Sequence, residues 1–200
     1  MKLHTFLCLL GTSVGATAIA ESDDRRAGRL EVYGAAQYLS GFDATLSVDG
    51  VNADFDYDAS LGGGFGFGYN LDRHWNLNFA VTGGTVETRT ILDGTALDSN
   101  ALLLNLDINV DYHLLSGPFT PFLTAGLNLT SVGDDLETSR VSLTYFQPEL
   151  GVNGGAGIRW DFAEHWFLKV LYRTQWRTGI ADLEGDHLVH GGTVAVGDKS

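Results

Sequence analysis

The sequence predicts an all-β fold: an eight-stranded antiparallel transmembrane β-barrel with short periplasmic turns and long outer loops. Three observations predict this fold. Apolar and polar residues alternate with period two along most of the chain, which is typical of strands with one apolar face. Long and short connections alternate between the expected strands, and aromatic residues gather beside those connections. Together these features are typical of a barrel that crosses a lipid bilayer.

Composition agrees with this fold class and excludes several others. The chain has 200 residues, of which 26 are Gly, and only 18 % are charged, below the ~25 % of ordinary globular domains. A single cysteine, Cys8, excludes a disulfide scaffold, and a formal charge of −13 excludes a basic nucleic-acid-binding protein. No run of ~18 apolar residues follows the N-terminus, so a bundle of transmembrane helices is excluded as well.

The first 20 residues have the layout of a secretory signal peptide. Lys2 supplies a positive start, Phe6–Gly15 is apolar, and Ala18-Ile19-Ala20 is a small-x-small cleavage site. We therefore expect a signal peptide at 1–20, cleaved on export, and an outer-membrane β-barrel domain at 21–200. Cleavage would remove Cys8 and leave the mature domain without cysteine.

Eight stretches carry the strand pattern. In Leu102–Tyr112, one face is wholly apolar, while the other is mostly polar. In Ser60–Tyr69, glycine takes the place of the polar residues at every second position. The other stretches repeat the alternation with aromatic and aliphatic residues on one face. The expected strands are about 29–41, 60–69, 75–82, 102–112, 119–132, 145–160, 166–177 and 187–197.

The connections between these stretches distinguish a barrel from a soluble β-sandwich. The short connections are 70–74, 113–118 and 161–165, and the long ones are about 42–58, 87–99, 133–144 and 178–186. A sandwich would explain the alternating strands but not this regular change of length. A transmembrane barrel has short turns on the periplasmic side, long loops on the outer side and an even number of strands.

Aromatic residues are expected to form two belts at the membrane surfaces. A hairpin turn centred near Ala163 would place Trp160 opposite Trp166, both facing outward at the periplasmic end. The periplasmic belt would also contain Tyr69, Trp75 and Tyr112, and the outer belt would contain Tyr38, Phe146 and Trp176.

The opposite face of the same strands would line the interior of the barrel. Its expected charged residues, here called the lumen network, are Asp107, Asp111, Glu149, Arg159, Lys169, Arg173 and Arg177. With Glu31, four acids face four bases, and the same register places Glu149 opposite Arg177.

Two interpretations of this interior remain open. An eight-stranded barrel has an interior just wide enough for side chains, and buried charges persist only when they are paired. We therefore expect a polar, salt-bridged plug, and the alternative is a narrow or gated path for ions. Inward glycines at 62, 64, 66 and 68 would either leave space for such a path or accommodate Phe122 or Phe167.

Four stretches of the chain carry a resemblance to a known family. They are 54–58 leading into the glycine-rich 62–70, then 117–128, 155–162 and 166–173. These stretches resemble the small eight-stranded outer-membrane barrels, the OmpA-like and opacity-protein group, with the OmpW-type barrels as close relatives. The resemblance implies a barrel of the Gram-negative outer membrane, but its motifs are architectural and specify no activity. The chain departs from the family pattern in its last strand, which lacks the usual terminal aromatic residue.

The sequence contains no catalytic constellation, so we expect neither an enzyme nor a cofactor. Some outer-membrane barrels of this size are lipid A-modifying enzymes, and a deacylase of that kind has a His-x-Ser pair, but this chain has no His-x-Ser, and no Gly-x-Ser-x-Gly occurs in the barrel domain at 21–200. His187 and His190 are three residues apart, so on a strand they would point to opposite faces and make a poor metal pair. The remaining metal candidates are Asp54, Asp56 and Asp58, whose carboxylates could bind Ca²⁺ or Mg²⁺. A solvated acidic rim is the alternative interpretation of that run.

The sequence thus predicts a monomeric outer-membrane barrel with a structural or surface-interaction role and a plugged lumen. The alternative is a porin-like channel for small or hydrophobic solutes, and a lipid A-modifying enzyme is a third class. The expected partners are outer-membrane lipid, lipopolysaccharide and the barrel-assembly machinery, with no nucleic acid.

Overall fold

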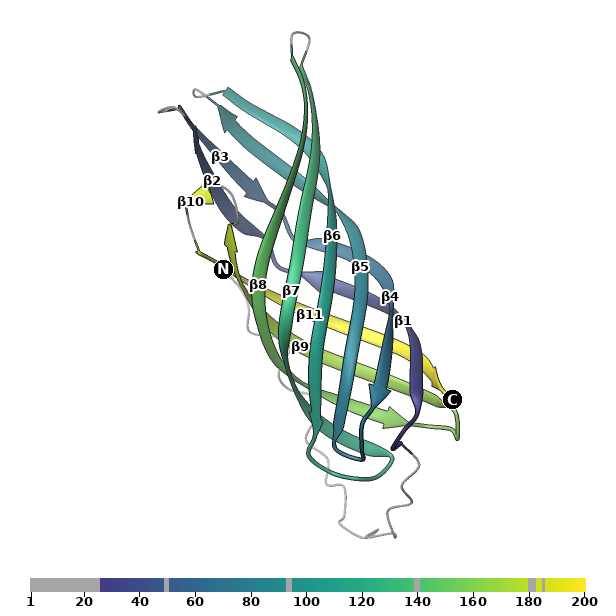
Figure 1. The fold of residues 1–200 in the computed structure, drawn as a ribbon. Helices are drawn as coiled ribbons and strands as arrows, with labels where there is room; N and C mark the ends of the chain where they lie inside the picture. Colours follow the sequence, from purple (N-terminus) through teal and green to yellow (C-terminus); the bar gives the residue numbers. More distant parts are fainter. Residues whose placement is uncertain (1–25, 49–50, 93–94, 139–140, 180–182, 185) are drawn as a thin grey trace, which may run out of the picture.

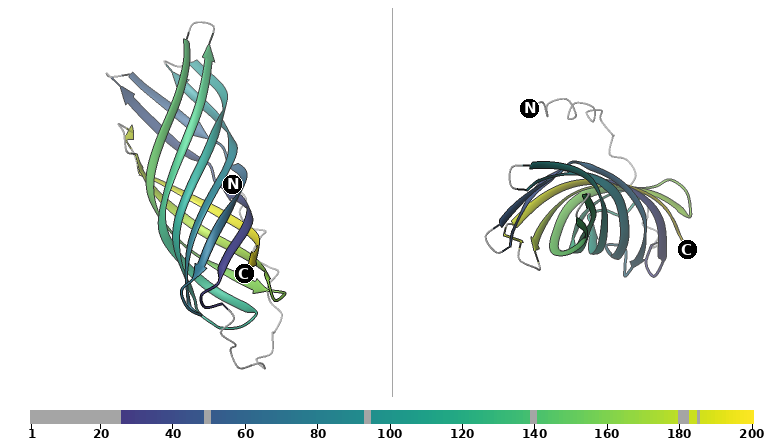
Figure 2. Two further views of the ribbon diagram at one scale, coloured as in Figure 1. Left: turned by 45° about the vertical axis from the view of Figure 1, so that its right-hand side comes forward. Right: turned by 90° about the horizontal axis from the view of Figure 1, so that it is seen from above.

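The computed structural model describes residues 26–200 apart from 49–50, 93–94, 139–140, 180–182 and 185, with side chains at 26–43, 56–89, 91, 98–133, 149–177 and 188–200. These residues form a closed antiparallel barrel whose strands tilt steeply against its long axis (Figures 1 and 2). The predicted fold class is confirmed. The part described contains no helix that is long and apolar enough to cross a membrane. The predicted signal peptide at 1–20 lies outside the described residues.

Eight barrel strands form the wall, and three of them are divided into two elements. The first consists of β1 (Leu30–Leu39) and β2 (Phe42–Val48), the second of β3 (Val51–Tyr57) and β4 (Ser60–Asn70), and the eighth of β10 (Leu183–Glu184) and β11 (Asp186–Lys199). The other five are β5 (Trp75–Leu92), β6 (Thr95–His113), β7 (Phe119–Thr138), β8 (Val141–Asp161) and β9 (Trp166–Gly179). Each stretch expected from the alternating pattern falls on one of these strands.

The ring closes where β1 pairs with β11, and the register shows how far the strands are staggered. Leu30 of β1 is paired with Tyr69 of β4. Following the paired residue from each strand to the next around the ring leads to His190 on β11. From there the path returns to β1 at Ser40, ten residues beyond its start. Because stagger, strand number and tilt are linked, this register gives tilted strands around an interior that side chains fill.

The outer connections are long, as expected, but they are regular strands instead of irregular loops. β2 pairs with β3 up to Val48 and Val51, and β5 with β6 up to Leu92 and Thr95. β7 and β8 project furthest from the barrel (Figure 1). Paired strands satisfy the backbone N–H and C=O groups of these segments. Their β-branched residues, as in 88–91, favour strands, so the sequence does carry a strand signal in these segments.

The hairpin between β8 and β9 turns one residue later than expected. Trp160 lies opposite Leu168 instead of Trp166, and Glu149 is no longer opposite Arg177, so both predicted pairings were wrong. Asp161 stays in β8 because its N–H donates to the Pro118 carbonyl at 2.8 Å. Each pairing is displaced by two positions, and because side chains on a strand alternate with period two, none of them changes face.

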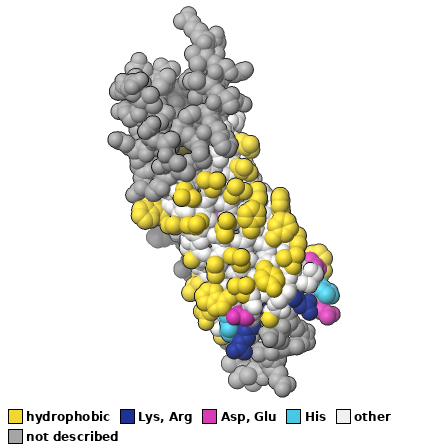
Figure 3. All heavy atoms as spheres, viewed as in Figure 1, with side chains coloured by type: hydrophobic (Ala, Val, Ile, Leu, Met, Phe, Trp, Pro, Cys, Tyr) yellow, Lys and Arg dark blue, Asp and Glu magenta, His cyan; other side chains and the backbone are white. Residues whose placement is uncertain are grey.

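The faces of the barrel are inverted relative to those of a soluble domain. Outward positions carry large apolar side chains such as Leu61, Leu102 and Phe119, each at least 60 % exposed. Figure 3 shows these side chains as a broad band over the described surface, with charged and histidine side chains at its lower rim. Inward positions carry buried Asn, Thr and charged residues. An apolar exterior around a polar interior is the arrangement that a lipid environment stabilises.

Aromatic side chains on the outer face lie near both ends of this band. At the end with the short turns, the rings of Trp75 and Tyr112 are 4.7 Å apart, and Trp160 stacks on Phe119 at 5.4 Å. The expected belt residues Tyr69, Trp75, Tyr112, Trp160, Trp166, Tyr38 and Trp176 are between 36 % and 50 % exposed. The side chain of Phe146 lies outside those described.

The belts predict the depth of the four tryptophans in a bilayer. In single-tryptophan variants, we expect bromine near the lipid headgroups to quench Trp160 or Trp176 fluorescence more strongly than bromine near the chain ends, because these rings lie at the interface. Ile108→Trp, at an outward position on β6 four residues beyond the belt residue Tyr112, should show the opposite order. Identical depth profiles for Trp160 and the Ile108→Trp variant would contradict the placement of the belts.

Candidate functional site: the ion-paired lumen

All seven residues of the lumen network are buried, none more than 6 % exposed as a whole residue. Asp107 and Asp111 come from β6, Glu149 and Arg159 from β8, and the remaining three from β9. Alternation along each strand turns these side chains inward. The structure therefore stacks charged groups along the interior of the barrel, although it does not pair all of them.

A cluster of five charged side chains fills the end of the lumen that carries the short turns. Arg159, which is fully buried, contacts Glu31 (Nη1–Oε1 2.6 Å) and Asp161 (Nη2–Oδ1 3.0 Å). Lys199 Nζ lies 3.1 Å from Asp161 Oδ1, and Arg26 Nε lies 3.4 Å from Asp161 Oδ2. Asp161 thus ties β11 and the segment before β1 to β8.

Sequence analysis missed three members of this cluster for a common reason. Arg26 precedes the first alternating stretch, while Asp161 and Lys199 lie at strand ends, where the period-two pattern no longer indicates which side chains are buried. Asp161 was assigned to a turn. The ladder of β8 and β9, which pairs Asp161 with Phe167, would have identified it as inward-facing.

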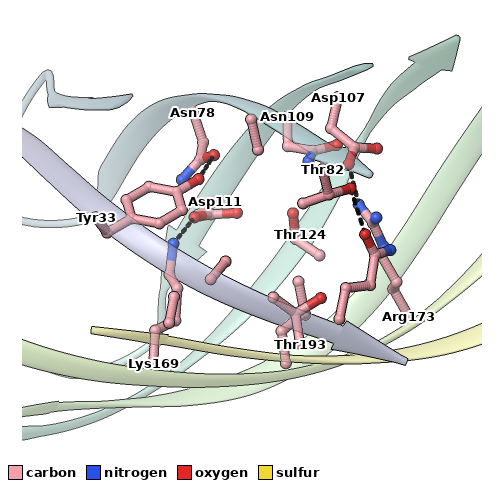
Figure 4. A pocket seen from close by; sticks show the side chains of 15 residues that line it. Tyr33, Asn78, Thr82, Asp107, Asn109, Asp111, Thr124, Lys169, Arg173 and Thr193 are labelled. Carbon is pink, nitrogen blue, oxygen red and sulfur yellow. Dashed lines mark hydrogen bonds and ion pairs between the residues drawn. The ribbon is translucent and has the colours of Figure 1, made fainter. Parts of the chain in front are cut away.

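Two further ion pairs cross the middle of the lumen. Lys169 Nζ lies 2.6 Å from Asp111 Oδ2, and Arg173 Nη1 lies 2.8 Å from Asp107 Oδ2. Figure 4 shows both pairs, together with Thr124, pointing into the same space between opposite walls. Each pair joins β6 to β9, strands that are not neighbours in the wall. The pairs therefore brace the barrel across its interior.

A cavity of about 40 Å³ lies between these two ion pairs. Its lining includes Asn109 Oδ1, Thr124 Oγ1 and Asp107 Oδ1, which have no hydrogen-bond partner among the described residues. It also includes the donors Gln37 Nε2 and Arg173 Nε, which are likewise unpartnered. A space of this size accommodates a few water molecules. A mixed lining of donors and acceptors suits water better than an ion of either sign.

Inward aromatic rings contact a cation of the cavity lining and a cation of the charged cluster at the turn end. Lys169 Nζ lies 5.0 Å from the centre of the Phe122 ring, and Arg159 Cζ lies 4.2 Å from the centre of the Phe167 ring. Such cation–π contacts stabilise buried cations. Tyr33 packs edge-on against Phe167 at 6.3 Å and donates to Asn78 Oδ1.

The glycines make room for these rings, although not in the pairing expected. A Cβ on Gly66 of β4 would overlap the ring of Tyr33, not that of Phe122 or Phe167. Phe122 instead occupies the space beside Gly157 on the neighbouring strand β8. The expectation failed because the stagger of the barrel decides which inward positions share a level, and a single strand does not reveal it.

Toward the outer end, Arg177 contacts uncharged side chains. Its Nε and Nη2 donate to Gln175 Oε1 at 3.1 and 2.5 Å, and its guanidinium lies 5.4 Å from the centre of the Phe42 ring. Glu149 acts on Arg177 electrostatically, but within the described part of the chain its Oε2 has no hydrogen-bond partner. The register shift described above explains why these two side chains do not meet directly.

Apolar side chains occupy the lumen beside Arg177, which sequence analysis did not anticipate. We call them the outer apolar cluster: Leu39, Tyr57, Val86, Ala101, Leu103, Val132 and Val189, with Phe42 packed against them. Most of them lie on strands facing β8 and β9. The sequence contains one signal of the outer apolar cluster: Leu102, Leu103 and Leu104 make both faces of β6 apolar at this level.

The acidic run considered for a metal is not assembled into a site by the described residues. Asp56 and Asp58 are both exposed, and the strand is interrupted between β3 and β4. The side chain of Asp54 lies outside those described. Within the described ranges, no group of three or more His, Cys, Asp or Glu side chains is placed to hold a metal ion.

Comparisons with known proteins agree with this geometry. The profile of the outer membrane protein β-barrel domain family matches residues 5–197. No curated protein matches the chain significantly. Among solved structures, OprG from Pseudomonas aeruginosa has a TM-score of 0.68 at 17 % identity, over 89 % of this chain and 99 % of that chain.

Two further structures have the same architecture. Neisserial surface protein A has a TM-score of 0.52 at 20 % identity, over 86 % of this chain and 97 % of that chain. Ail from Yersinia pestis, solved in complex with the heparin analogue sucrose octasulfate, has a TM-score of 0.53 at 10 % identity, over 87 % and 99 % of the two chains. At these identities the likeness concerns the fold.

Proposed function

Because the chain belongs to the family of outer membrane protein β-barrel domains, we propose that it is a non-enzymatic structural barrel of the Gram-negative outer membrane. In this proposal the lumen is closed and the outer hairpins form a contact surface. The signal peptide at 1–20 is removed on export, and the barrel is a monomer held by outer-membrane lipid and lipopolysaccharide after insertion by the assembly machinery.

One observation supports the closed lumen above all others: ion pairs cross it at several levels. Glu31–Arg159, Asp111–Lys169 and Asp107–Arg173 each join strands on different sides of the interior at 2.6–2.8 Å. Separating such a pair leaves uncompensated buried charges, which costs roughly 3–5 kcal/mol per pair. An ion crossing the barrel would have to displace these pairs in turn and then pass the outer apolar cluster.

The outer hairpins supply the surface part of the proposal. Ail was solved with a polyanion, whereas this chain carries a net charge of −13. Exposed carboxylates at Asp56, Asp58 and Asp98 lie on or beside these hairpins. Like charges repel, so a polyanionic partner is disfavoured here, and a cationic surface or the divalent ions that bridge lipopolysaccharide are favoured.

The test of the closed lumen is the ion conductance of the refolded protein in a planar bilayer. We expect no discrete steps, because the ion-paired interior leaves no continuous aqueous path. The same preparation must show heat-dependent gel mobility, which demonstrates that a silent sample is folded. Reproducible conductance steps from folded protein would refute the closed lumen and make transport the leading function.

A channel for small hydrophobic solutes is the second candidate, and one observation favours it. The outer apolar cluster presents apolar side chains inside an otherwise polar lumen. Binding of a fluorescent apolar dye to the folded wild type, lost in the variant Leu103→Asn, would support this candidate even if the ionic conductance is absent. Equal dye binding by both proteins would count against it.

A further inference from the structure

The segment before β1 folds back against the barrel instead of extending away from it. Arg29 N–H donates to the Arg26 carbonyl at 3.1 Å, which closes a turn, and Gly28 has a φ of 75°, a conformation that glycine adopts without strain. Gly28 N–H donates to the Asn70 carbonyl at 2.8 Å, so the turn is attached to the end of β4. The side chain of Arg26 is thereby directed into the barrel and is only 8 % exposed.

The Arg26 guanidinium occupies a slot with three acceptors. Nη2 donates to the Gly117 carbonyl at 2.9 Å and to Thr120 Oγ1 at 2.7 Å, and Nε lies 3.4 Å from Asp161 Oδ2. The Thr120 hydroxyl donates its own proton to the Gly117 carbonyl at 2.9 Å, which leaves its lone pairs available to Arg26. A guanidinium group is planar and presents its N–H donors in a fixed fork. A site whose acceptors lie along the edge of that fork therefore favours a guanidinium over an ammonium group.

The charges around this slot balance without Arg26. Glu31 and Asp161 face Arg159 and Lys199, two acids against two bases, all contributed by barrel strands. Arg26 adds a third cation, and burial lowers its pKa while Asp161 opposes that effect. Withdrawal of Arg26 therefore leaves no uncompensated acid in the cluster, in contrast to the loss of a strand-borne partner.

We propose that Gly117, Thr120 and Asp161 form a guanidinium-binding site at the turn end of the barrel, and that residues 26–29 are a latch that places Arg26 in it. The latch leaves the slot without unfolding the barrel, and the empty slot then binds a guanidinium group from solution. This inference is independent of whether the lumen conducts ions, since neither Arg26 nor the three residues of the slot line the cavity in the lumen.

Chemical rescue of Arg26→Ala tests the binding site. Using protein purified from outer membranes, we expect this variant to unfold about 2–4 °C below wild type, the size of a lost hydrogen-bonded group. Millimolar guanidinium chloride should raise its midpoint relative to the same concentration of sodium chloride. The control is Arg29→Ala, which removes the same charge from the same turn; the ion pairs found among the described residues do not include the Arg29 side chain.

The outcome of the rescue decides the proposal. Wild type and Arg29→Ala should respond equally to the two salts, because their slot is filled. An Arg26→Ala variant that also responds equally would show that the slot binds no free guanidinium and would overturn the assignment of a binding site.

Trypsin tests the latch without replacing Arg26. The protease must take the Arg26 side chain into its own pocket to cut the Arg26–Ala27 bond, so the bond should resist cleavage while the slot is filled. In Thr120→Val, which removes one acceptor and keeps the side-chain volume, we expect cleavage at this bond to be several-fold faster while the barrel remains folded by gel mobility. Equal cleavage in wild type and Thr120→Val would show that the slot does not hold the segment.

Discussion

Replacing Arg159 with methionine is expected to destabilise the folded barrel by roughly 3–5 kcal/mol, the cost of removing one partner from a buried ion pair. Arg159 is fully buried, and among the described residues its loss leaves Glu31 with the amides of Asn70 and Asn76, at 2.7 and 3.5 Å, as its partners. Asp161, the other carboxylate that contacts Arg159, keeps its ion pair with Lys199. The measurement is urea unfolding of the vesicle-embedded protein, followed by tryptophan fluorescence.

The exposed pair on the outer hairpin provides the matched control. Arg89 lies 3.8 Å from Asp98, with side chains 63 % and 83 % exposed, so Arg89→Met should cost less than about 1 kcal/mol. The double variant Glu31→Gln/Arg159→Met should recover part of the lost stability, because no unpaired carboxylate remains at position 31. Equal unfolding midpoints for Arg159→Met and Arg89→Met would show that the interior ion pairs do not stabilise the barrel.

Gly66→Val should cost roughly 1–3 kcal/mol through overpacking of the lumen. A Cβ at this position would overlap the ring of Tyr33, which is 7 % exposed and held by its hydrogen bond to Asn78. The ring has little room to move, since it packs edge-on against the buried ring of Phe167. The unfolding assay described for Arg159 measures the effect.

Gly34→Val on the adjacent strand β1 is the control for Gly66→Val. A Cβ on Gly34 meets nothing within 4 Å and faces outward, so valine there should leave stability unchanged or increase it through its preference for strands. Adding Tyr33→Ala to Gly66→Val should produce less destabilisation than the two single changes summed, because the residues share one space. Strict additivity would refute the steric explanation.

The fold was predictable because its signal is local. Period-two alternation, as in 102–112, identifies a strand and its apolar face from neighbouring residues alone, and each expected strand has its counterpart in the barrel. The inward position of Asp107, Lys169 and Arg173 follows from the same alternation. Their pairing across the lumen does not, since β6 and β9 are separated by two other strands.

The errors of prediction also have a common origin, which is register. Trp160 was paired with the wrong residue because the hairpin ladder continues through Asp161, whose contacts come from β11 and the N-terminal segment. The role of Gly66 was misjudged because the stagger around the ring sets which inward side chains share a level. Neither the register of the β8–β9 hairpin nor the stagger around the ring can be read from a single strand.

The sequence by itself determined the architecture of this protein: a closed barrel with an apolar exterior, a charged interior and aromatic residues near both ends of its band. Alternation along each strand is sufficient to determine this architecture, because lipid accepts the apolar face of the strands and the lumen accepts the polar face. Only the tertiary structure decided which charges meet, where apolar residues close the outer end, and that Arg26 enters the slot beside Asp161. These contacts join residues far apart in the chain, and the stagger and turns of the whole barrel bring them together.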